Sequence, residues 1–547
     1  MRRPLEYCFR LLLPVLGMLA CGGGGGGGSA PPPVSAPTNL VYATNPAIYT
    51  EGVAIPADTP SSGGGAVATY SVQPALPAGL GLSATSGVLT GTPTAVAAAA
   101  TYTVTAANSA GSTTAGLSIT VKAPPPSIQS FSVGPDTAVT YPNDTTSSLY
   151  LTNFPDEHTT FIPLGGSSGY LVFGASRVST STTGGGAVVL QTTDLATFQF
   201  ATALGYNAQI MAPPMSFTQC DATYATEFDE NYSAPGTVVQ DPTLPGGNLI
   251  MIYEAENHCP GGINQQPYYG TVGLARSADN GRTWPASVNS PLGGTGRYAI
   301  LKGPNPQPAT PSYPSMGNAI PSAFVETNAQ GVSYLYVVYF YADGGFAPTS
   351  DHLQRVARAK LGTDPLVFQK WYNGAFSQSG IGGLDSGVLP APGCTGGIQN
   401  MGQISYNDDL GLYLLTFICR GGGTGAWYYA TATSLERQDW SAPQLIQNSQ
   451  FPFTSPCPGS TTGSQFDGFY PSFMSPGAAA GHTKLTGMVF YMTGCDTGKR
   501  TFMSRTFTIT LTAPTGAAGL VASTQAQHLP RRFISIASEW LPKNRQP

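Results

Sequence analysis

Carboxylate side chains are the groups in this chain best suited to carry out chemistry. Two of them, Glu254 and Glu256, end a strongly apolar run and stand two residues apart, so on a strand both point to the same side. Carboxyl groups that face a shared cavity can divide the work, because one donates a proton while the other activates water or attacks carbon. We therefore predict a catalytic set of four acids: Asp156, Asp241, Glu254 and Glu256.

Further polar and aromatic residues accompany these acids. The residues predicted to contact a substrate are Arg177, His258, Arg420, Asp467 and Tyr470. Aromatic rings of the same region either stack on a ligand or pack between strands, and they include Tyr268, Tyr269, Trp371, Tyr372 and Trp427.

Each predicted catalytic acid also has a structural interpretation. Asp241 precedes a proline and could equally cap a turn. Asp156 and Asp467 could be solvated loop residues, and only one of Glu254 and Glu256 needs a function. The choice depends on which elements position these side chains.

A repeated unit supplies those elements. From Ser127 to Thr512 the chain repeats an inner strand, a hairpin, a strongly apolar second strand and a third strand that leads to a turn. The copies pass through residues 161–173, 240–253, 320–339, 401–417 and 470–492. Such sheets can bury their faces only against neighbours, and closing the ring removes exposed edges. The sequence therefore predicts a five-bladed β-propeller over residues 127–512, with the polar residues above gathered at the mouth where inner strands begin.

One third-strand turn carries a specific motif. The segment Ser277-Ala-Asp279-Asn-Gly281-Arg-Thr283-Trp284 resembles the Asp-box of sialidases and related propellers. In such a turn the aspartate accepts backbone hydrogen bonds, the glycine takes the strained position and the tryptophan packs between strands. The resemblance implies a turn on the propeller face away from the catalytic centre, so it indicates fold and not function.

The N-terminus is typical of an exported protein. Residues 1–21 combine arginines with the short apolar run Leu11 to Ala20, which predicts a signal peptide. The run ends at Met18-Leu19-Ala20-Cys21, which resembles a bacterial lipobox and implies lipidation of Cys21. Residues 22–35 form a glycine and proline tether. We expect a lipoprotein of the outer membrane or cell surface, with a periplasmic or secreted protein as the alternative.

Residues 36–122 form a second type of segment, with alternating short runs and almost no charge. Leu76-Pro-Ala-Gly-Leu80 and Tyr102-Thr-Val-Thr resemble the cadherin-like Ig repeat of bacterial surface proteins, which implies a β-sandwich. Clustered carboxylates are missing, so we predict no calcium or other metal. Residues 123–126 are a proline linker, and residues 513–547 are a tail without an assigned function.

Composition narrows the possible partners. Charged residues make up 9% of the chain, and the formal charge is −5. Removal of the predicted signal peptide takes away Arg2, Arg3, Glu6 and Arg10, which together carry +2, so the mature chain has a formal charge of −7. Nucleic-acid binding needs a clustered basic surface, which the sequence lacks. We therefore expect no nucleic-acid partner, no cofactor and a monomer.

The cysteines after the signal follow the repeat. One of each pair precedes an inner strand and the other follows the second strand of the same blade, which predicts three clips around the mouth. Free buried thiols are the alternative. The predicted pairs are Cys220 with Cys259, Cys394 with Cys419, and Cys457 with Cys495.

A final resemblance concerns function. Gln240-Asp241-Pro242-Thr243 followed by Glu254 is similar to the pattern of the arabinanase and β-fructosidase clan of five-bladed glycoside hydrolases. It implies that Asp241 is the supporting or basic carboxylate, that Glu254 or Glu256 is the acid and that Asp156 is the third member. An Arg-Ile-Pro motif and an arginine triad are absent, which speaks against a sialidase.

The sequence thus predicts glycan recognition at the cell envelope, with glycoside hydrolase activity at the propeller mouth. The opposing interpretation is a non-catalytic adhesin or scaffold that binds through the propeller face. Two carboxylates roughly 5 to 10 Å apart in an open central pocket would favour the enzyme.

Overall fold

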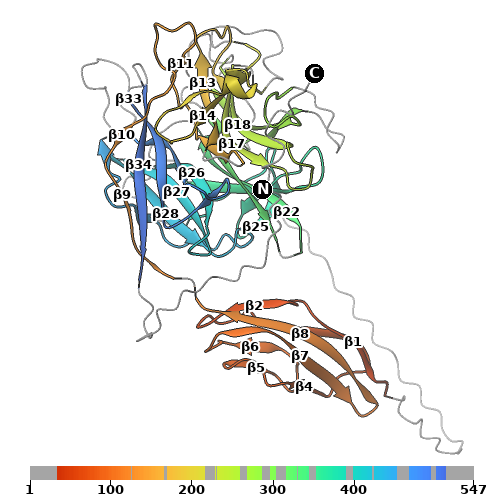
Figure 1. Cartoon of the computed structure of the whole chain (residues 1–547). Helices are drawn as coiled ribbons and strands as arrows, with labels where there is room; N and C mark the ends of the chain where they lie inside the picture. The colour runs from red at the N-terminus through yellow and green to blue at the C-terminus, as the bar shows by residue number, and fades with distance from the viewer. Residues whose placement is uncertain are drawn as a thin grey trace, which may run out of the picture. The chain divides into compact units, whose positions relative to one another are not determined.

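The computed structural model describes residues 34–124, 126–165, 169–215, 228–229, 231–258, 268–285, 296–303, 316–328, 330–343, 353–389, 398–421, 424–452, 467–494 and 500–512. Contacts divide the chain into two compact units with a boundary after Pro124 (Figure 1). The predicted signal peptide, Cys21 and the tail lie outside the described residues.

The first unit is the Ig-like sandwich that the sequence predicted. One sheet has the order β2 (Ala47–Thr50), β8 (Gly111–Lys122), β7 (Ala97–Asn108), β4 (Thr69–Gln73). Two smaller pairs are β1 (Pro37–Tyr42) with β3 (Pro60–Gly64), and β5 (Leu80–Leu82) with β6 (Leu89–Gly91). Alternate residues of β7 and β8 are buried, among them Val104 and Leu117, because one face of this sheet forms the core.

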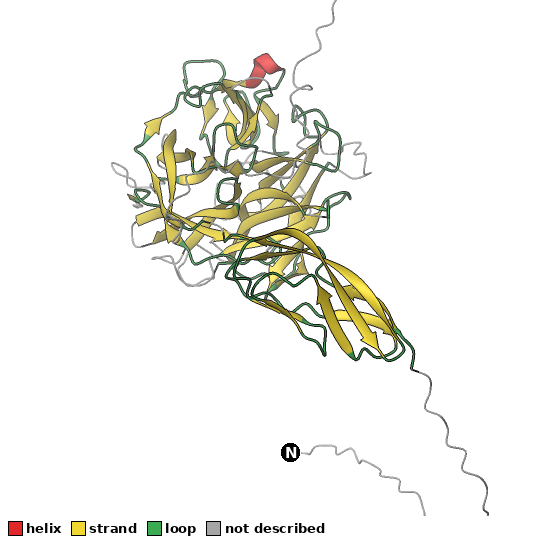
Figure 2. Cartoon of the chain, turned by 60° about the horizontal axis from the view of Figure 1, so that its bottom comes forward, coloured by secondary structure: helices red, strands yellow, loops and turns green. Residues whose placement is uncertain are grey.

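The second unit is the predicted five-bladed β-propeller, built almost entirely of strands (Figure 2). Blade 1 contains β12 (Thr160–Pro163), β13 (Tyr170–Val178), β14 (Gly186–Thr192), β15 (Gln199–Phe200) and β16 (Gln209–Met211). Blade 2 contains β17 (Tyr232–Gln240), β18 (Leu249–Asn257), β19 (Tyr269–Ser277) and β20 (Arg297–Leu301). Blade 3 contains β21 (Met316–Thr327), β22 (Ser333–Asp343), β23 (Gln354–Lys360), β24 (Gln369–Tyr372) and β25 (Ala375–Ser379). Blade 4 contains β26 (Ile398–Asn407), β27 (Leu412–Gly421), β28 (Thr424–Ala432), β29 (Gln444–Leu445) and β30 (Phe451–Pro452). Blade 5 contains β31 (Phe469–Met474), β33 (Thr486–Gly494) and β34 (Arg500–Leu511).

The N-terminal strand of this unit completes the last blade. Strand β9 (Ile128–Val133) pairs antiparallel with β34, so blade 5 combines the two ends of the propeller sequence. Phe131 of β9 is 2% exposed and packs against the rings of Tyr429, Phe473 and Phe507. Three short strands add edges: β10 (Thr137–Ala138) on β34, β11 (Leu151–Thr152) on β13 and β32 (His482–Thr483) on β26.

Strand direction defines one end of the ring, which we call the mouth. Inner strands begin there and second strands end there, as the register of β17 shows by pairing its first residue, Tyr232, with Glu256 near the end of β18. In blade 4, Ile398 at the start of β26 pairs likewise with Arg420 near the end of β27. The predicted gathering of these strand ends is thus confirmed.

Four inner strands bulge close to the mouth. The register shifts in β17, β21, β26 and β31, at Gly236 in the first of them. In the other three a non-glycine residue takes a left-handed φ: Ile320 at 51°, Met401 at 54° and Tyr470 at 55°. Bulges of this kind re-aim side chains and free backbone groups, and they are frequent beside functional sites.

Side chains of neighbouring inner strands bind each other's backbone. Each bond runs from an amide of one blade to a polar side chain of the preceding blade, so it ties two neighbouring blades together. The bonds are Val238 N to Thr160 Oγ1 (3.0 Å), Ala323 N to Thr237 Oγ1 (3.1 Å), Phe473 N to Gln403 Oε1 (2.7 Å) and Thr159 N to Ser472 Oγ (2.8 Å).

The turn after β19 has the contacts expected from its sequence. Asp279 Oδ1 accepts hydrogen bonds from Ser277 Oγ (2.7 Å) and Thr283 N (3.0 Å). Gly281 has a φ of 81°, and Trp284 is 2% exposed with its Nε1 donating to the Gly281 carbonyl at 3.0 Å. The turn lies at the end opposite the mouth, because β19 runs away from it.

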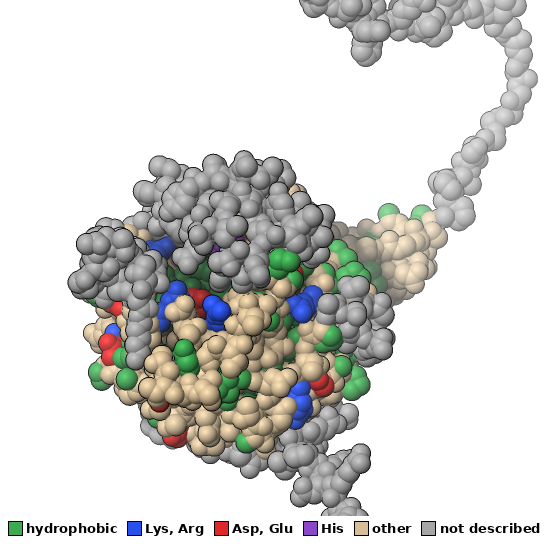
Figure 3. Space-filling view, turned by 90° about the horizontal axis from the view of Figure 1, so that it is seen from above, with side chains coloured by type: hydrophobic (Ala, Val, Ile, Leu, Met, Phe, Trp, Pro, Cys, Tyr) green, Lys and Arg blue, Asp and Glu red, His purple; other side chains and the backbone are tan. Residues whose placement is uncertain are grey.

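Helix is rare in this unit. A short 3₁₀ helix, η1 (Ala201–Leu204), follows β15, and among the described residues no helix has the length and apolar character needed to cross a membrane. On the face seen in Figure 3 the described charged side chains are scattered over a largely uncharged surface.

Candidate functional site

Strand β18 and the residue that follows it present three polar side chains at the mouth. Glu254, Glu256 and His258 alternate with Ala255 and Asn257, so they share one side of the strand. All three are largely buried: Glu254 is 3% and His258 4% exposed, and the Glu256 side chain is 12% exposed. The apolar residues Leu249 to Tyr253 hold this strand between its neighbours, which fixes where the polar end lies.

Blade 1 brings three more polar residues to the same place. Asp156, Glu157 and His158 precede β12, and the amide of Asp156 donates to the Ala175 carbonyl of β13 at 3.1 Å. Tyr232 of β17 donates to the Asp156 carbonyl at 3.0 Å. The segment is thereby held by both blade 1 and blade 2.

The glutamates form an interacting series. The side chain of Glu254 interacts with those of Glu157 and Glu256. Burial, with the neighbouring carboxylates adding to it, raises the pKa of Glu157 well above its ordinary value. Burial likewise raises the pKa of Glu254 and of Glu256 to about 8. At neutral pH these side chains therefore hold protons that an exposed glutamate would have released.

His258 extends the series. Its Nε2 lies 2.6 Å from Glu256 Oε2, and its ring packs beside Tyr268 at 5.2 Å between centroids. Burial lowers the pKa of His258 to about 4, so the ring is neutral at neutral pH. Tyr268 also interacts with the Glu256 side chain, and this interaction opposes the rise in the pKa of Glu256. Both contacts hold the Glu256 carboxyl in position.

The bulge in β21 supplies a backbone donor. Ile320 N donates to Glu254 Oε2 at 2.7 Å, and its left-handed conformation turns this amide out of the regular ladder. A backbone conformation that costs about 1 to 3 kcal/mol for a residue of this type is thus placed directly beside the acids.

Asp156 has a different environment from the glutamates. Its side chain is 22% exposed and forms an ion pair with Arg500, the first residue of β34. Burial alone would lower the pKa of Arg500, but the interactions with Asp156, Tyr470 and Tyr232 together outweigh burial and raise it. Buried neutral acids thus lie next to an ion-paired carboxylate, which is the type of asymmetry that separates an acid from a base.

Asp241 is not at this site, and its predicted placement is wrong. It follows the inner strand β17 instead of beginning it, because Gln240 pairs with Leu249 while Ala234 pairs with Glu254. Seven residues of strand, about 23 Å at about 3.3 Å per residue, separate Asp241 from Ala234. Its Oδ1 caps a turn by accepting from Thr243 N at 3.0 Å, and its Oδ2 pairs with Arg276 at 3.0 Å. The turn-capping interpretation is the one the structure supports.

The predicted substrate-binding residues divide into two groups. Tyr470 joins the acids, since burial and then the charges of Asp156 and Glu157 raise its pKa. Arg420 is 6% exposed and lies over the Phe469 ring at 5.3 Å, next to Tyr470 in sequence, and burial lowers its pKa to about 10. Arg177 is exposed and donates to the Ser181 carbonyl at 3.2 Å, so the structure does not place it in the cluster.

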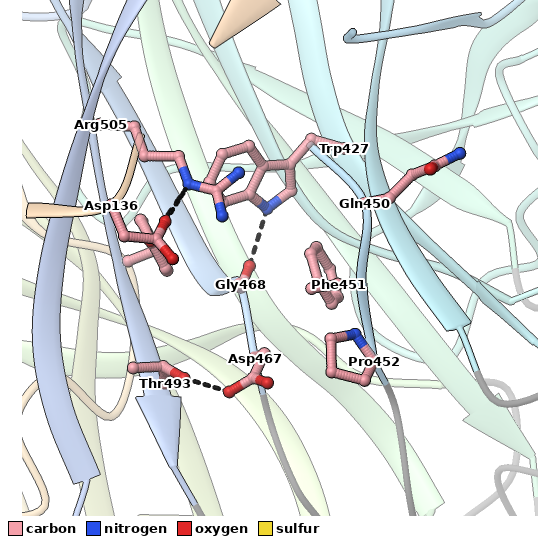
Figure 4. A pocket seen from close by; sticks show the side chains of 10 residues that line it. Asp136, Trp427, Gln450, Phe451, Pro452, Asp467, Gly468, Thr493 and Arg505 are labelled. Carbon is pink, nitrogen blue, oxygen red and sulfur yellow. Dashed lines mark hydrogen bonds and ion pairs between the residues drawn. The ribbon is translucent and has the colours of Figure 1, made fainter. Parts of the chain in front are cut away.

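Asp467 lines a different pocket, between blades 4 and 5 (Figure 4). Thr493 donates to its carboxylate. Arg505 in the same pocket pairs with Asp136 and lies over the Trp427 ring at 5.4 Å. The charged groups that line this pocket, Asp136, Asp467 and Arg505, are thus engaged with neighbouring side chains.

Two residues of the site were not predicted from the sequence, and the predicted catalytic set lacks a third. Arg500 is 344 positions from Asp156, and no local pattern joins them. Tyr232 reads as an ordinary strand residue. Glu157 follows Asp156 in the sequence but is not in the predicted catalytic set; its position next to the start of an inner strand was the signal that could have included it.

Of the predicted disulfide residues, only Cys419 lies within the described part of the chain. It is near the end of β27 at the mouth, it is disulfide-bonded, and its partner lies outside the described residues. The pairing with Cys394 therefore stays a prediction, as do the other two pairs.

Comparison with known proteins gives the following similarities. Residues 32–122 match the family described as "Putative Ig domain". No curated protein matches the chain by sequence. Among solved structures, the chain is similar to the α-L-arabinofuranosidase PaAbf62A of Podospora anserina in complex with cellotriose, with 10% identity, 70% of this chain and 98% of that chain covered, and a TM-score of 0.38. It is also similar to the GH43 endo-arabinanase of Bacillus licheniformis, with 13% identity, coverage of 65% and 96%, and a TM-score of 0.34. An N-acetylgalactosamine deacetylase from F. plautii in complex with blood group B trisaccharide shows 14% identity, coverage of 69% and 95%, and a TM-score of 0.36.

Proposed function

We propose that this chain is an exported glycan-recognising propeller protein that acts as a glycoside hydrolase at its mouth. The observation that carries the proposal is the side-by-side placement of buried, proton-holding glutamates and the ion-paired Asp156. Glycoside hydrolysis needs such a pair, because one carboxyl protonates the leaving oxygen while a second activates water or attacks the sugar.

Glu256 is the acid in this proposal. It holds its proton at neutral pH, and with 12% exposure its side chain is the most accessible of the three glutamates. Asp156 is the base or nucleophile, since its 22% exposure lets it reach a substrate while Arg500 fixes its orientation. Glu157 and Glu254, which are more deeply buried than Glu256, support the acid.

One observation favours the alternative, a binding protein without catalysis. The glutamate side chains interact directly with one another, whereas the carboxyl pair of glycosidases is separated by roughly 5 to 10 Å. They cannot act as that pair among themselves, so catalysis depends on Asp156.

A glycan-release screen tests the proposal. We expect the wild-type mature chain to release sugar from at least one glycan, and Glu256→Gln and Asp156→Asn each to reduce release at least about 100-fold. Glu436→Gln is the matched control, because Glu436 is 60% exposed and pairs with Arg358 on the propeller surface. If the wild type and all variants bind a glycan and none of them releases sugar, the adhesin or scaffold is favoured. Equal release by wild type and Glu256→Gln would reject Glu256 as the acid.

Export and anchoring form a separate part of the proposal and rest on the resemblance of residues 18–21 to a lipobox. We expect wild type to incorporate labelled palmitate and Cys21→Ala to lose the label. Label on both proteins, or on neither, would reject lipidation at Cys21.

A further inference from the structure

The pocket between blades 4 and 5 lies apart from the acids of the mouth. It encloses about 210 Å³ and is bounded by β28, β30, β33 and β34, by the residues just before β31 and by the link between β9 and β10. Arg505 in its wall follows Arg500 by five residues on the same strand, a separation of about 17 Å at about 3.3 Å per residue. The pocket is therefore a separate place for a ligand.

Each member of the ion pair in this pocket keeps one polar atom unused. Tyr491 OH, at 2.5 Å, and Arg505 Nε both donate to Asp136 Oδ1. Arg505 Nη1 donates to the Asn448 carbonyl at 2.8 Å. These contacts leave Asp136 Oδ2 and Arg505 Nη2 without a hydrogen-bond partner among the described residues. An unused acceptor thus stands beside an unused donor.

The charges of the pair decide what these two atoms can bind. Burial alone would raise the pKa of Asp136, but the hydrogen bonds from Arg505 and Tyr491 and the Arg505 charge outweigh burial and lower it. Asp136 is therefore ionised at neutral pH, so its Oδ2 only accepts hydrogen bonds, while Arg505 Nη2 only donates them. A hydroxyl does both, so two adjacent hydroxyls fit, one donating to Asp136 and the other accepting from Arg505.

Aromatic rings supply the apolar part of the pocket. The Trp427 ring lies 5.0 Å from that of Tyr491 and 6.1 Å from that of Phe451, measured between centroids. Phe451 and Pro452 lie across the pocket from the ion pair (Figure 4). Apolar walls with a few convergent polar groups are typical of small-molecule sites, and about 210 Å³ is less than the roughly 300 to 1,000 Å³ that holds a drug-sized ligand. The pocket therefore suits one ring-sized unit.

We propose that this pocket is a second carbohydrate-binding site, which holds one neutral sugar unit by two adjacent hydroxyls on Asp136 Oδ2 and Arg505 Nη2. A sugar ring has C–H groups for the aromatic wall and hydroxyls for the ion pair. A more open hollow of about 540 Å³ also borders Asp136 and Arg505, which leaves room for units linked to the bound sugar. The proposal rests on glycan recognition by this chain but not on hydrolysis at the mouth.

Saturation-transfer NMR on the full mature chain tests this site. The probes are the methyl glycosides of arabinose, xylose, galactose and glucose, each with free hydroxyls and with all hydroxyls methylated. We expect at least one free glycoside to bind wild type, and its methylated form not to bind, because an ether cannot donate to Asp136. The mouth double variant Asp156→Asn/Glu256→Gln should keep this binding, since it leaves the pocket intact.

Two pocket variants, each made in the mouth double variant, locate the binding. Asp136→Ala removes the acceptor, and Arg505→Lys keeps a cation but loses the planar fork that presents Nη2. We expect each to raise the Kd of the bound glycoside at least about tenfold, the loss of one hydrogen bond to a charged group. The Asp136 side chain is 52% exposed, so Asp136→Ala should keep the urea midpoint of its parent. The surface variant Glu436→Gln is the control and should bind as its parent does.

The outcomes separate this site from the proposed function. An unchanged Kd in both pocket variants, or equal binding of the methylated glycoside, would overturn the site. Binding that is lost in the mouth double variant would place the sugar at the mouth, which overturns the second site and supports the proposed function. Failure of every probe to bind would also overturn the site, whereas sugar release in the glycan screen would still support the proposed function.

Discussion

At the scale of single residues, the protonation state of Glu256 determines what it can do. Burial, with the Asp156 charge adding to it, raises its pKa to about 8, so the acid form predominates at neutral pH. We expect wild-type glycan release to fall as the pH rises through about 8, because the leaving oxygen then lacks its proton donor. Initial rates between pH 5 and pH 9 on a glycan found in the screen measure this, and rates that stay constant from pH 7 to pH 9 would contradict it.

Asp241 should behave as a structural residue. It is fully buried and its partner Arg276, which also lies 3.2 Å from Asp364, is 4% exposed. We expect Asp241→Asn to destabilise the propeller by about 1.5 to 3 kcal/mol, the range for hydrogen bonds to charged groups. Urea unfolding gives this value, and glycan binding per folded molecule should equal that of wild type. Lost binding with unchanged stability would return Asp241 to the functional site.

The residues of the site differ in how far the sequence could reveal them. Glu254, Glu256 and His258 follow an apolar run whose length marks the end of a strand, so their common side was predictable. Asp241 was misplaced because hydrophobic runs flank its hairpin on both sides, and alternation alone does not say on which side the inner strand lies. Arg500 was out of reach, since only ring closure brings β34 next to Asp156.

At the scale of elements, the bulges of the inner strands decide how closely the blades approach one another. Gly236 occupies the bulge of β17, and a Cβ added there would lie 1.8 Å from the Pro321 carbonyl oxygen of β21. No side chain fits at this distance without separating blades 2 and 3.

We therefore expect Gly236→Ala to destabilise the propeller by about 3 kcal/mol or more, at the upper end of overpacking effects. Gly331→Ala is the control, because Gly331 has a φ of 75° but open space around it. The control should cost only about 1 kcal/mol of backbone strain. Urea midpoints compare the two variants, and equal midpoints would show that the blades can yield at this junction.

The elements themselves were largely predictable. Second strands such as β18 and β27 are continuous apolar runs because both of their faces pack against other sheets, and the five copies of this run fixed the blade count. The bulges were not predictable. Ile320-Pro321 and Tyr470-Pro471 were recognised as strand starts, but the left-handed conformation depends on contacts between blades that no local pattern contains.

At the scale of the whole molecule, the ring is closed by a strand from the opposite end of the propeller sequence. Strand β9 forms the outer edge of blade 5, with Phe131 opposite Ile509 and Val133 opposite Phe507. Its loss would expose the buried rings that Phe131 covers and leave β34 with an open edge.

Truncation separates the contribution of this strand from that of the Ig-like unit. Because the contacts divide after Pro124, a chain that begins at Ser127 should unfold at the same urea concentration as the mature chain. A chain that begins at Thr137 lacks β9 and should lose the cooperative transition, while Phe131→Ala in the mature chain should cost about 3 to 5 kcal/mol. Tryptophan fluorescence follows all three, since the removed residues contain no tryptophan. An unchanged transition after removal of β9 would mean that four blades and an open fifth suffice, and the closed ring would then no longer explain how residues as distant as Asp156 and Arg500 are held together.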